Sequence, residues 1–371
     1  MTSMLWMFRP IDTWFFRGSS SFNAGEPANA GRSIFPPSMQ TLQGAIRSAL
    51  AQGQGWNPRQ THLWPEALGD PNSLGELQLS GPYLCRFSNN QYEYLFPPMA
   101  TILYATDAED RVHFTRLEPV LCDLDPRQGI RLATPLEPYE GLKPLQEVWL
   151  TRKGCEKVLA GDIPASADII KADALWTNET RVGIGLDSKR RTTITGQLYS
   201  TTHTRFVCKT LCLVVVVNGV PQSWHQQCPN TVTLGGEGRM AQIEIKTAPP
   251  HLLPEVPRLS PRNGKTRFTV SLVTPGVFND ETEEVVRFGP KSFGERCICA
   301  CIGKMQRIGG WDIARGVPRP VRPVIPAGST WFYESEETDI NTILSWHGRK
   351  VGDMTEYGYG QVIIGKWGEK L

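Results

Sequence analysis

Three segments of the chain carry the pattern of polar and apolar positions expected of helices. After Pro36, Pro37 and Ser38, five apolar residues recur with the spacing i, i+3, i+4, i+7 and i+8, which places them on one helical face. These residues are Leu42, Ala45, Ile46, Ala49 and Leu50. A second helix is predicted over residues 145–160, and a short third one over residues 339–346.

Strands are predicted where apolar or β-branched residues alternate with polar ones or run together. Residues 206–217 are almost continuously apolar, which is typical of a buried strand. Residues 181–205 are polar, basic and rich in threonine, with glycines as turn points, and this pattern predicts a long projecting hairpin over about residues 178–206. The other predicted strands span residues 4–9, 74–87, 92–96, 240–246, 266–273, 297–302, 329–334 and 361–366.

A proline-rich stretch divides the chain. Five prolines lie between residues 248 and 261, a density that leaves no regular element and predicts a boundary between residues 1–250 and 251–371. Each half begins with an apolar strand and ends with a glycine-rich loop that leads into a final strand. The order strand, helix, strands, helix, strand predicts an α+β protein of two ferredoxin-like (RRM-like, βαββαβ) domains with a projecting hairpin. Residues 146–176 form an insert in this scheme.

Composition narrows the classes of protein that fit. The chain has 371 residues, of which 39 are basic and 37 acidic, so its formal charge is +2. This length suits two domains at about 150 residues each, and 40% apolar with 20% charged residues excludes wholesale disorder. The near-neutral charge excludes a polycation. Any nucleic-acid binding therefore depends on local basic patches.

The sequence also predicts a compartment. Residues 1–10 lack the cationic, apolar and small-residue regions of a signal peptide. The most apolar run, residues 211–217, is far shorter than the roughly 20 residues that cross a bilayer. Nine cysteines, an odd count, fit reduced thiols better than a disulfide framework. We therefore expect a cytoplasmic protein with no membrane partner.

The hairpin segment is the first candidate for binding chemistry. Residues 181–209 carry six basic side chains and one acidic one, with Tyr199 and His203 between them. Basic groups beside a stacking aromatic are what single-stranded RNA binding requires. A solvated hairpin is the ordinary structural alternative. The contrast with a nearly neutral chain favours RNA binding.

A glycine-rich loop over residues 234–239 is the second candidate. It lacks the Lys-Ser/Thr pair of a phosphate-binding P-loop and the spacing of a dinucleotide fingerprint. Gly235, Gly236 and Gly238 would let the backbone approach a ligand closely, and Arg239 would add a bidentate phosphate donor. A tight strand connection explains the glycines equally well. The loop around Tyr359 occupies the corresponding place in the second half.

Residues 296–322 form a second basic patch, with six basic residues opposed only by Asp312. An RNA track and a protein interface are both compatible with it.

Cys297, Cys299 and Cys301 alternate along a predicted strand, so their thiols are expected on one face. Their spacing matches no common zinc site, and buried small side chains are the expected role. We predict no metal and no cofactor.

Several short motifs, in order, resemble those of a known family. The chain is similar from about Trp14 to Gly360 to the third-numbered subunits of the Cmr effector complex in type III-B CRISPR–Cas systems, within the RAMP superfamily. The order and spacing of the motifs carry the resemblance more than any single motif does. They are Trp14–Gly18, Pro36–Ser38, Gln43–Arg47, Arg181–Ile184, Gly196–Tyr199, Leu234–Arg239 and Pro326–Ser329.

The resemblance implies a non-catalytic subunit that holds the 5′ repeat-derived tag of the CRISPR RNA. It also implies docking against a large polymerase-like subunit and contact with the backbone RNase subunit, so that target RNA is met only indirectly. The basic hairpin would be a thumb that kinks the RNA. With the residue-based arguments above, the expected RNA-binding residues are Arg17, Arg47, Arg181, Lys189, Arg190, Arg191, Tyr199, His203, Gly235, Gly236, Gly238 and Arg239.

Two other functions remain open at this point. Some RAMP relatives are metal-independent endoribonucleases that process CRISPR RNA, and here His203 would be the general base, with Tyr199 as a possible assistant. A protein–protein adaptor without RNA contact is the third alternative.

The chain departs from the family pattern at one place. Where the pattern leads us to expect acidic residues before Gly196, this chain has Ile194 and Thr195.

Overall fold

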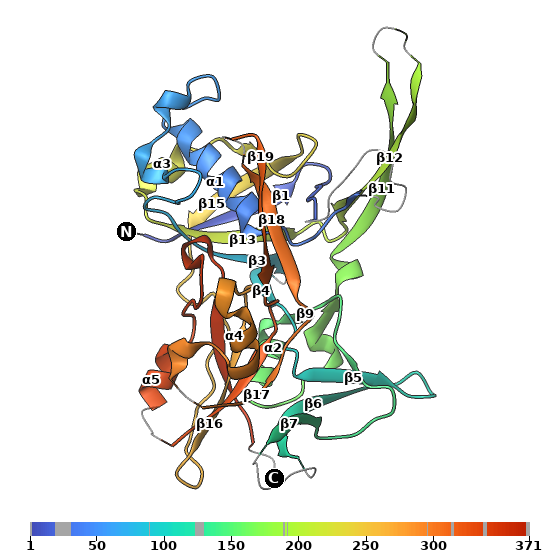
Figure 1. Ribbon diagram of the computed structural model, residues 1–371, viewed down its shortest axis with the longest axis vertical. Helices are drawn as coiled ribbons and strands as arrows, with labels where there is room; N and C mark the ends of the chain where they lie inside the picture. The colour runs from blue at the N-terminus through green and yellow to red at the C-terminus, as the bar shows by residue number, and fades with distance from the viewer. Residues whose placement is uncertain are drawn as a thin grey trace. The chain divides into compact units, whose positions relative to one another are not determined.

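The computed structural model describes residues 2–18, 31–88, 90–122, 130–187, 190, 192–294, 296–312, 315–336 and 340–368. Within these residues the protein is a mixed α+β structure, rich in strands, with few helices and several antiparallel sheets (Figure 1). The chain forms two compact units, each built from three segments. Unit 1 contains Met1–Asn89, Ala172–Ala248 and Arg307–Val321, and unit 2 contains Asn90–Lys171, Pro249–Gln306 and Arg322–Leu371. The linear division at residue 250 stays a prediction.

Unit 1 is organised around an antiparallel sheet whose strands follow the order β3-β13-β1-β15-β14. The two innermost strands are apolar on both faces: Trp6, Met7 and Phe8 of β1 are all fully buried. This explains why their sequences lack the alternation of a half-exposed strand. The elements, in chain order, are β1 (Met4–Pro10), α1 (Met39–Gly53), β3 (Gln78–Ser88), β13 (Leu211–Asn218), α3 (Gln222–Gln226), β14 (Thr231–Thr233) and β15 (Met240–Thr247).

The predicted first helix is confirmed. Helix α1 begins one residue after Ser38 and ends at Gly53, and its five periodic apolar residues are all buried. The helix lies against α3, β14 and β3. Burial of this apolar stripe, rather than a side-chain cap at Ser38, holds the helix in place.

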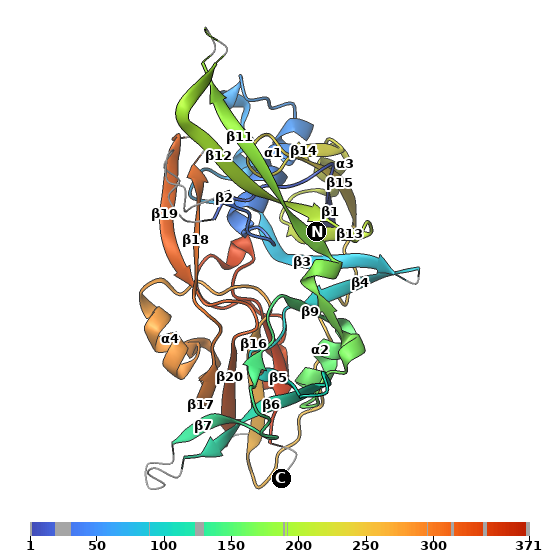
Figure 2. The same cartoon turned by 90° about the vertical axis from the view of Figure 1, so that its right-hand side faces the viewer.

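The predicted hairpin is also confirmed. Strands β11 (Trp176–Leu186) and β12 (Thr193–Phe206) pair antiparallel from Trp176 opposite Phe206 outward. Figures 1 and 2 show the two strands extending well beyond the sheet of unit 1. At the base, Phe35 packs against Trp176 and Phe206 with ring centroids 4.7 and 5.4 Å apart. An aromatic cluster therefore anchors the end nearest the core.

Unit 2 contains a second antiparallel sheet with the order β17-β20-β16-β21. Its core stacks Phe268 on Tyr333 at 5.2 Å and surrounds them with Trp331 and Trp346. The elements, in chain order, are β16 (Thr266–Leu272), α4 (Thr282–Phe288), β17 (Arg296–Cys301), β20 (Thr330–Ser335), α5 (Ile340–Ser345) and β21 (Val362–Lys366).

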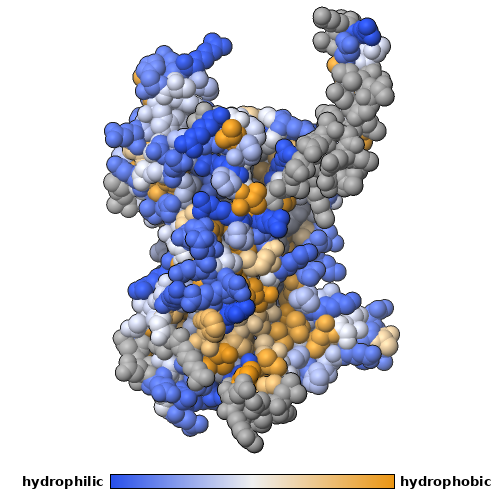
Figure 3. Space-filling view, viewed as in Figure 1, coloured by the Kyte–Doolittle hydropathy of each residue, from blue (hydrophilic) through white to orange (hydrophobic). Residues whose placement is uncertain are grey.

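A further set of strands belongs to unit 2, and the sequence predicted only the one at residues 92–96. One sheet has the order β7-β6-β5-β8, and strands β10, β9 and β4 lie side by side next to helix α2. Figure 3 shows apolar side chains gathered on the face of unit 2 that is turned to the viewer. The elements are β4 (Gln91–Phe96), β5 (Ile102–Thr106), β6 (Val112–Leu121), β7 (Arg131–Pro135), β8 (Lys143–Pro144), β9 (Val148–Thr151), α2 (Arg152–Leu159) and β10 (Ile169–Lys171).

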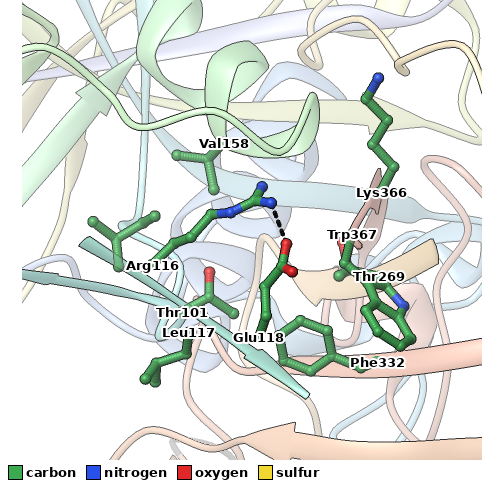
Figure 4. Close-up of a pocket in the computed structure, with 10 residues that line it drawn as sticks. Thr101, Arg116, Leu117, Glu118, Val158, Thr269, Phe332, Lys366 and Trp367 are labelled. Atoms are coloured by element: carbon green, nitrogen blue, oxygen red, sulfur yellow. Dashed lines mark hydrogen bonds and ion pairs between the residues drawn. The ribbon is translucent and has the colours of Figure 1, made fainter. Parts of the chain in front are cut away.

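A buried ion pair joins β6 to the C-terminal segment of unit 2. Arg116 and Glu118 are each only about 7% exposed at the side chain, and they pair directly (Figure 4). Arg116 also donates to the Gly161 carbonyl, and the Gly368 amide donates to Glu118 at 3.1 Å. Every charged group of the pair therefore has partners. The pair lines a small pocket together with Thr101, Phe332 and Trp367.

Two expectations need correction. The helix predicted over residues 145–160 begins only at Arg152, because residues 148–151 form strand β9 and Thr151 caps the helix by accepting from the Gly154 amide. The thiols of the cysteine triplet do not share one face, because a bulge between Cys297 and Cys299 turns the first away from the other two. Burial raises the pKa of Cys299 to about 11 and that of Cys301 to about 12.

The third predicted helix is observed as α5, and residue 339, where it was expected to begin, lies outside the described residues. Among the residues that the structure describes, no helix is long and apolar enough to cross a membrane.

The central strand of unit 1 offers a test of this core. Leu213 in β13 is fully buried between Phe8 of β1 and Leu84 of β3. We expect Leu213→Ala to lower the stability of unit 1 by about 2–5 kcal/mol, because it leaves a cavity in a core strand. Val207→Ala, at a position 52% exposed, should change stability by less than about 0.5 kcal/mol. Urea denaturation followed by tryptophan fluorescence measures the stability of both variants. Equal denaturation midpoints would contradict the placement of Leu213 in the core.

Candidate nucleic-acid interface

The glycine-rich loop rests on the segment that follows β1. The Gly236 amide donates to the Phe15 carbonyl at 2.8 Å. Gly235 has φ +96°, and a Cβ there would lie 2.7 Å from the same carbonyl oxygen. These two glycines therefore serve a close contact between two parts of the backbone. Gly238, with φ +65°, has open space where a side chain would be.

Three arginines and three acids form a network at the root of the β11–β12 hairpin, called the arginine cluster here. Arg181 donates to Glu179 at 2.8 Å and to Asp12 at 2.9 Å. Arg205 donates to the same two carboxylates, with 3.0 Å to Asp12. Arg239 completes the cluster through Asp12 at 3.4 Å and Glu237 at 3.3 Å. Residues from four separate parts of unit 1 therefore meet at one point.

The charges of this cluster are mutually stabilised. The Arg181 guanidinium is the main cause that holds the pKa of Asp12 below its usual range, and Arg205 does the same for the pKa of Glu179. Both acids are therefore ionised at neutral pH. The side chains of Arg181 and Arg205 are 31% and 41% exposed, and their ion pairs with Asp12 and Glu179 orient both guanidiniums. Such pre-oriented guanidiniums suit bidentate contacts with phosphate.

His203 is enclosed beneath this cluster. Its ring is fully buried, stacks on Phe15 at 5.3 Å, and lies within 3.1–3.2 Å of Thr13, Thr201 and Glu237. An ionised carboxylate such as that of Glu237 can only accept a hydrogen bond, so we assign the ring proton of His203 to Nε2. The other nitrogen, Nδ1, then accepts a hydrogen bond from the Thr13 hydroxyl. Burial lowers the pKa of His203, so the ring is neutral at pH 7.

The remaining expected residues are spread over unit 1. Arg17 is exposed next to Ser33, whereas Arg47 is buried, donates to Gln43 and to the Asp70 carbonyl, and stacks over Trp64. Arg190 is exposed at the hairpin turn. On β12, Tyr199 lies opposite Gly183, but its side chain, like residues 189 and 191 entirely, lies outside the described residues. Their roles in RNA binding stay predictions.

Sequence reasoning missed the acidic half of the arginine cluster. Glu179 lies just before the basic stretch and two residues from Arg181, so the alternation of the strand could have revealed their shared face. Asp12 is 169 residues from Arg181 and carries no local signal. Of the six basic residues counted along residues 181–209, Arg181 and Arg205 are therefore paired with acids at the root of the hairpin.

The outer part of the other face of β11 is apolar. Val182, Ile184 and Leu186 alternate along the strand and are 69%, 50% and 59% exposed. Side chains of this kind on a projecting ribbon have no packing role in the described part of unit 1. The hairpin thus combines an oriented arginine cluster at its base with an apolar stripe along its length.

Comparison with known proteins decides the family. The family model described as CRISPR-associated protein (Cas_Cmr3) matches residues 6–367. The chain belongs to the Cas_Cmr3 family. The resemblance inferred from the ordered motifs is thereby confirmed at family level. No curated protein is similar enough to be matched.

Solved structures share the fold of this Cas_Cmr3 family member. A chain from the type III-B Cmr-β complex bound to cognate target RNA and AMPPnP, studied by cryo-EM, has a TM-score of 0.55 and 15% identity. The match covers 98% of this chain and 99% of the other. A second structure, of the same type of complex bound to cognate target RNA, gives a TM-score of 0.53 at 16% identity, over 97% and 96% of the two chains.

The buried histidine predicts a pH dependence at the hairpin root. Because its folded pKa lies below its ordinary value, the unfolded chain takes up a proton that the folded chain resists, so stability is full above about pH 6.5 and falls as the pH drops. We expect His203→Gln to show a smaller loss of melting temperature between pH 7.5 and pH 5.5 than the unchanged protein. His225, which is buried elsewhere in unit 1, contributes equally to the pH dependence of the unchanged protein and of His203→Gln. Parallel curves for the two proteins would contradict a neutral, buried His203.

Proposed function

We propose that this chain is a non-catalytic RNA-binding and scaffolding subunit of a type III-B CRISPR Cmr effector complex. The observation that carries the proposal is the Cas_Cmr3 family match over residues 6–367. Structures of similar fold, from Cmr-β complexes bound to cognate target RNA, support it. In this proposal the protein acts in the cytoplasm, in RNA-guided antiviral defence.

The RNA partner in the proposal is the CRISPR RNA, held by its 5′ tag at the hairpin of unit 1. The exposed parts of Arg181 and Arg205 would contact phosphates, while the stripe of Val182, Ile184 and Leu186 would meet the face of an unstacked base. Asp12 and Glu179 hold the arginines in place for this contact. The hairpin then acts as a thumb at a kink in the RNA.

The protein partners in the proposal are the large polymerase-like subunit and the backbone RNase subunit, and target RNA is met through them. Apolar side chains exposed on the β5–β8 sheet of unit 2 suit a protein interface. They are Val112, Val120, Leu121, Ile130, Leu132 and Leu136. The proposal involves no membrane, metal or cofactor.

We also propose that both units derive from a ferredoxin-like plan. In unit 1 the chain order β1, α1, β3, β13, α3, β15 is folded with the sheet order β15-β1-β13-β3. In unit 2 the chain order β16, α4, β17, β20, α5, β21 is folded with the sheet order β21-β16-β20-β17. In both units the strands lie side by side in the order fourth, first, third and second, which is the sheet order of a βαββαβ unit. The long segment from β4 to β12 would be an insertion between the second and third strands.

Binding is favoured over cleavage by the state of His203. A general base must reach the proton that it removes, but this ring is fully buried and both of its nitrogens have partners. The endoribonuclease alternative therefore has no exposed base at this position.

The RNA grip can be tested through charge. We expect the triple variant Arg181→Ala, Arg190→Ala and Arg191→Ala to retain less CRISPR RNA. The deficit should be largest at low salt and shrink as salt rises, because each lost phosphate contact removes about 0.7 from the slope of log affinity against log salt. The measurement is RNA recovered with the tagged subunit over a salt series. The matched control, Arg111→Ala, Arg287→Ala and Arg349→Ala, removes the same charge from exposed positions of unit 2. Equal retention by both triples would refute the hairpin grip.

Catalysis can be tested separately. We expect no cleavage of repeat-containing RNA by the purified chain in EDTA, and no difference between the unchanged protein and His203→Ala, measured by gel analysis of end-labelled RNA. Cleavage that His203→Ala abolishes would instead establish the endoribonuclease.

A further inference from the structure

A second, shorter ribbon of unit 1 has unexplained surface chemistry. Strands β18 (Gln306–Asp312) and β19 (Val317–Val324) form a two-stranded sheet that closes with the Gly316 amide donating to the Asp312 carbonyl at 2.8 Å. One face approaches helix α1, since a Cβ on Gly310 would lie 3.7 Å from the Cβ of Gln40. Asp312 lies on that same face, is 4% exposed, and pairs with Arg319 at 3.7 Å.

The opposite face is exposed and carries Trp311. All eleven tryptophans lie within the described residues, and Trp311, at 59% exposure, is the only one of them whose side chain is exposed. Arg307 and Gly309 share its face, because side chains alternate along a strand. A Cβ on Gly309 would lie 3.6 Å from Val321, so this exposed valine borders the same surface. We call this surface the Trp311 face.

The edge of the ribbon limits what kind of partner fits. Pro318 and Pro320 are two residues apart on β19, so their missing amide donors fall on the same edge. An edge without donors resists the addition of another strand. A protein partner that binds by strand addition at the β19 edge is thereby disfavoured.

The net charge of the ribbon is positive. From Arg307 to Val321 the described residues include Arg307, Arg315 and Arg319 against Asp312 alone. Arg315 and Arg319 pair with Asp312, at 3.9 and 3.7 Å, on the face that approaches α1, so Arg307 is the arginine that shares the Trp311 face. An exposed indole with an arginine and a residue without a side chain on the same face is the chemistry that stacks a base and binds its phosphate.

We infer that the Trp311 face binds single-stranded RNA, with the Trp311 indole stacked on one base and Arg307 on a neighbouring phosphate. This site is separate from the β11–β12 hairpin and rests on the proposed function only in that the chain handles RNA. Gly309 leaves room for the sugar and phosphate next to the stacked base. Val321 borders the base on the second strand.

The test is the affinity of the full chain for a fluorescein-labelled uridine 20-mer, measured by fluorescence anisotropy at low salt. We expect Trp311→Ala to weaken binding by about 5- to 150-fold, the range for losing one base–aromatic stack. Trp311→Phe should restore most of the affinity, because phenylalanine keeps a stacking face. The matched control is Phe288→Ala, which removes an aromatic ring that is 64% exposed on α4 of unit 2 and should leave affinity unchanged.

A second readout locates the contact directly. RNA that carries 4-thiouridine, irradiated on the unchanged chain, should crosslink to the peptide that contains Trp311, and Arg307→Ala should reduce the salt slope by about 0.7. If Trp311→Ala binds RNA as the unchanged chain does while the triple hairpin variant does not, the Trp311 face is not an RNA site and the proposed function stands. If Trp311→Ala instead loses a co-purifying protein with RNA affinity intact, the face is a protein interface and the inference fails. If neither site's variants alter RNA binding, both proposals fail.

Discussion

The pairing of β1 on both of its edges is the constraint on which the candidate interface depends. β1 lies between β13 and β15, and its register fixes Phe8 opposite both Leu213 and Ile243. Asp12, Thr13 and Phe15 follow within a few residues and supply contacts to the arginine cluster, to His203 and to the glycine-rich loop. Because β1 is buried on both faces, a one-residue slip would exchange the side chains of the two faces and move Asp12, Thr13 and Phe15 away from these partners. The same pairing that forms the core therefore also positions the surface chemistry.

The arginine cluster shows how opposite charges can prepare a binding surface without creating a strongly positive one. Asp12 and Glu179 together hold Arg181 and Arg205, so the flexible side chains lose little freedom when a phosphate arrives. The phosphate must compete with those carboxylates, which weakens non-specific attraction. In the proposed RNA complex, recognition would then depend on the shape of the hairpin and on the apolar stripe of β11 as much as on charge. A nearly neutral chain would in this way select one RNA conformation.

Local patterns predicted much of the fold, and long-range contacts limited the rest. Helix α1 and the β11–β12 hairpin follow from periodicity and turn residues within single segments. Helix α2 was placed too early because Val148, Trp149 and Leu150 suit either a helix or a strand, and pairing with β10 decides for the strand. The cysteine triplet was misjudged because a bulge at residue 298 follows from tertiary pairing, which alternation alone does not reveal. In the candidate site, Arg181 and Arg239 had local signals, but Asp12 had none.

The composition of each unit from three segments has a consequence for the synthesis of the protein. Unit 1 is complete only when residues 307–321 have been made, although its first strand begins at residue 4. During translation, every strand of the sheet of unit 1 is therefore made before the ribbon that lies beside α1. A nascent chain in that state exposes surface that the finished protein covers. Order of synthesis and order of assembly are thus separate, and the last part of unit 1 is added after most of unit 2 has left the ribosome.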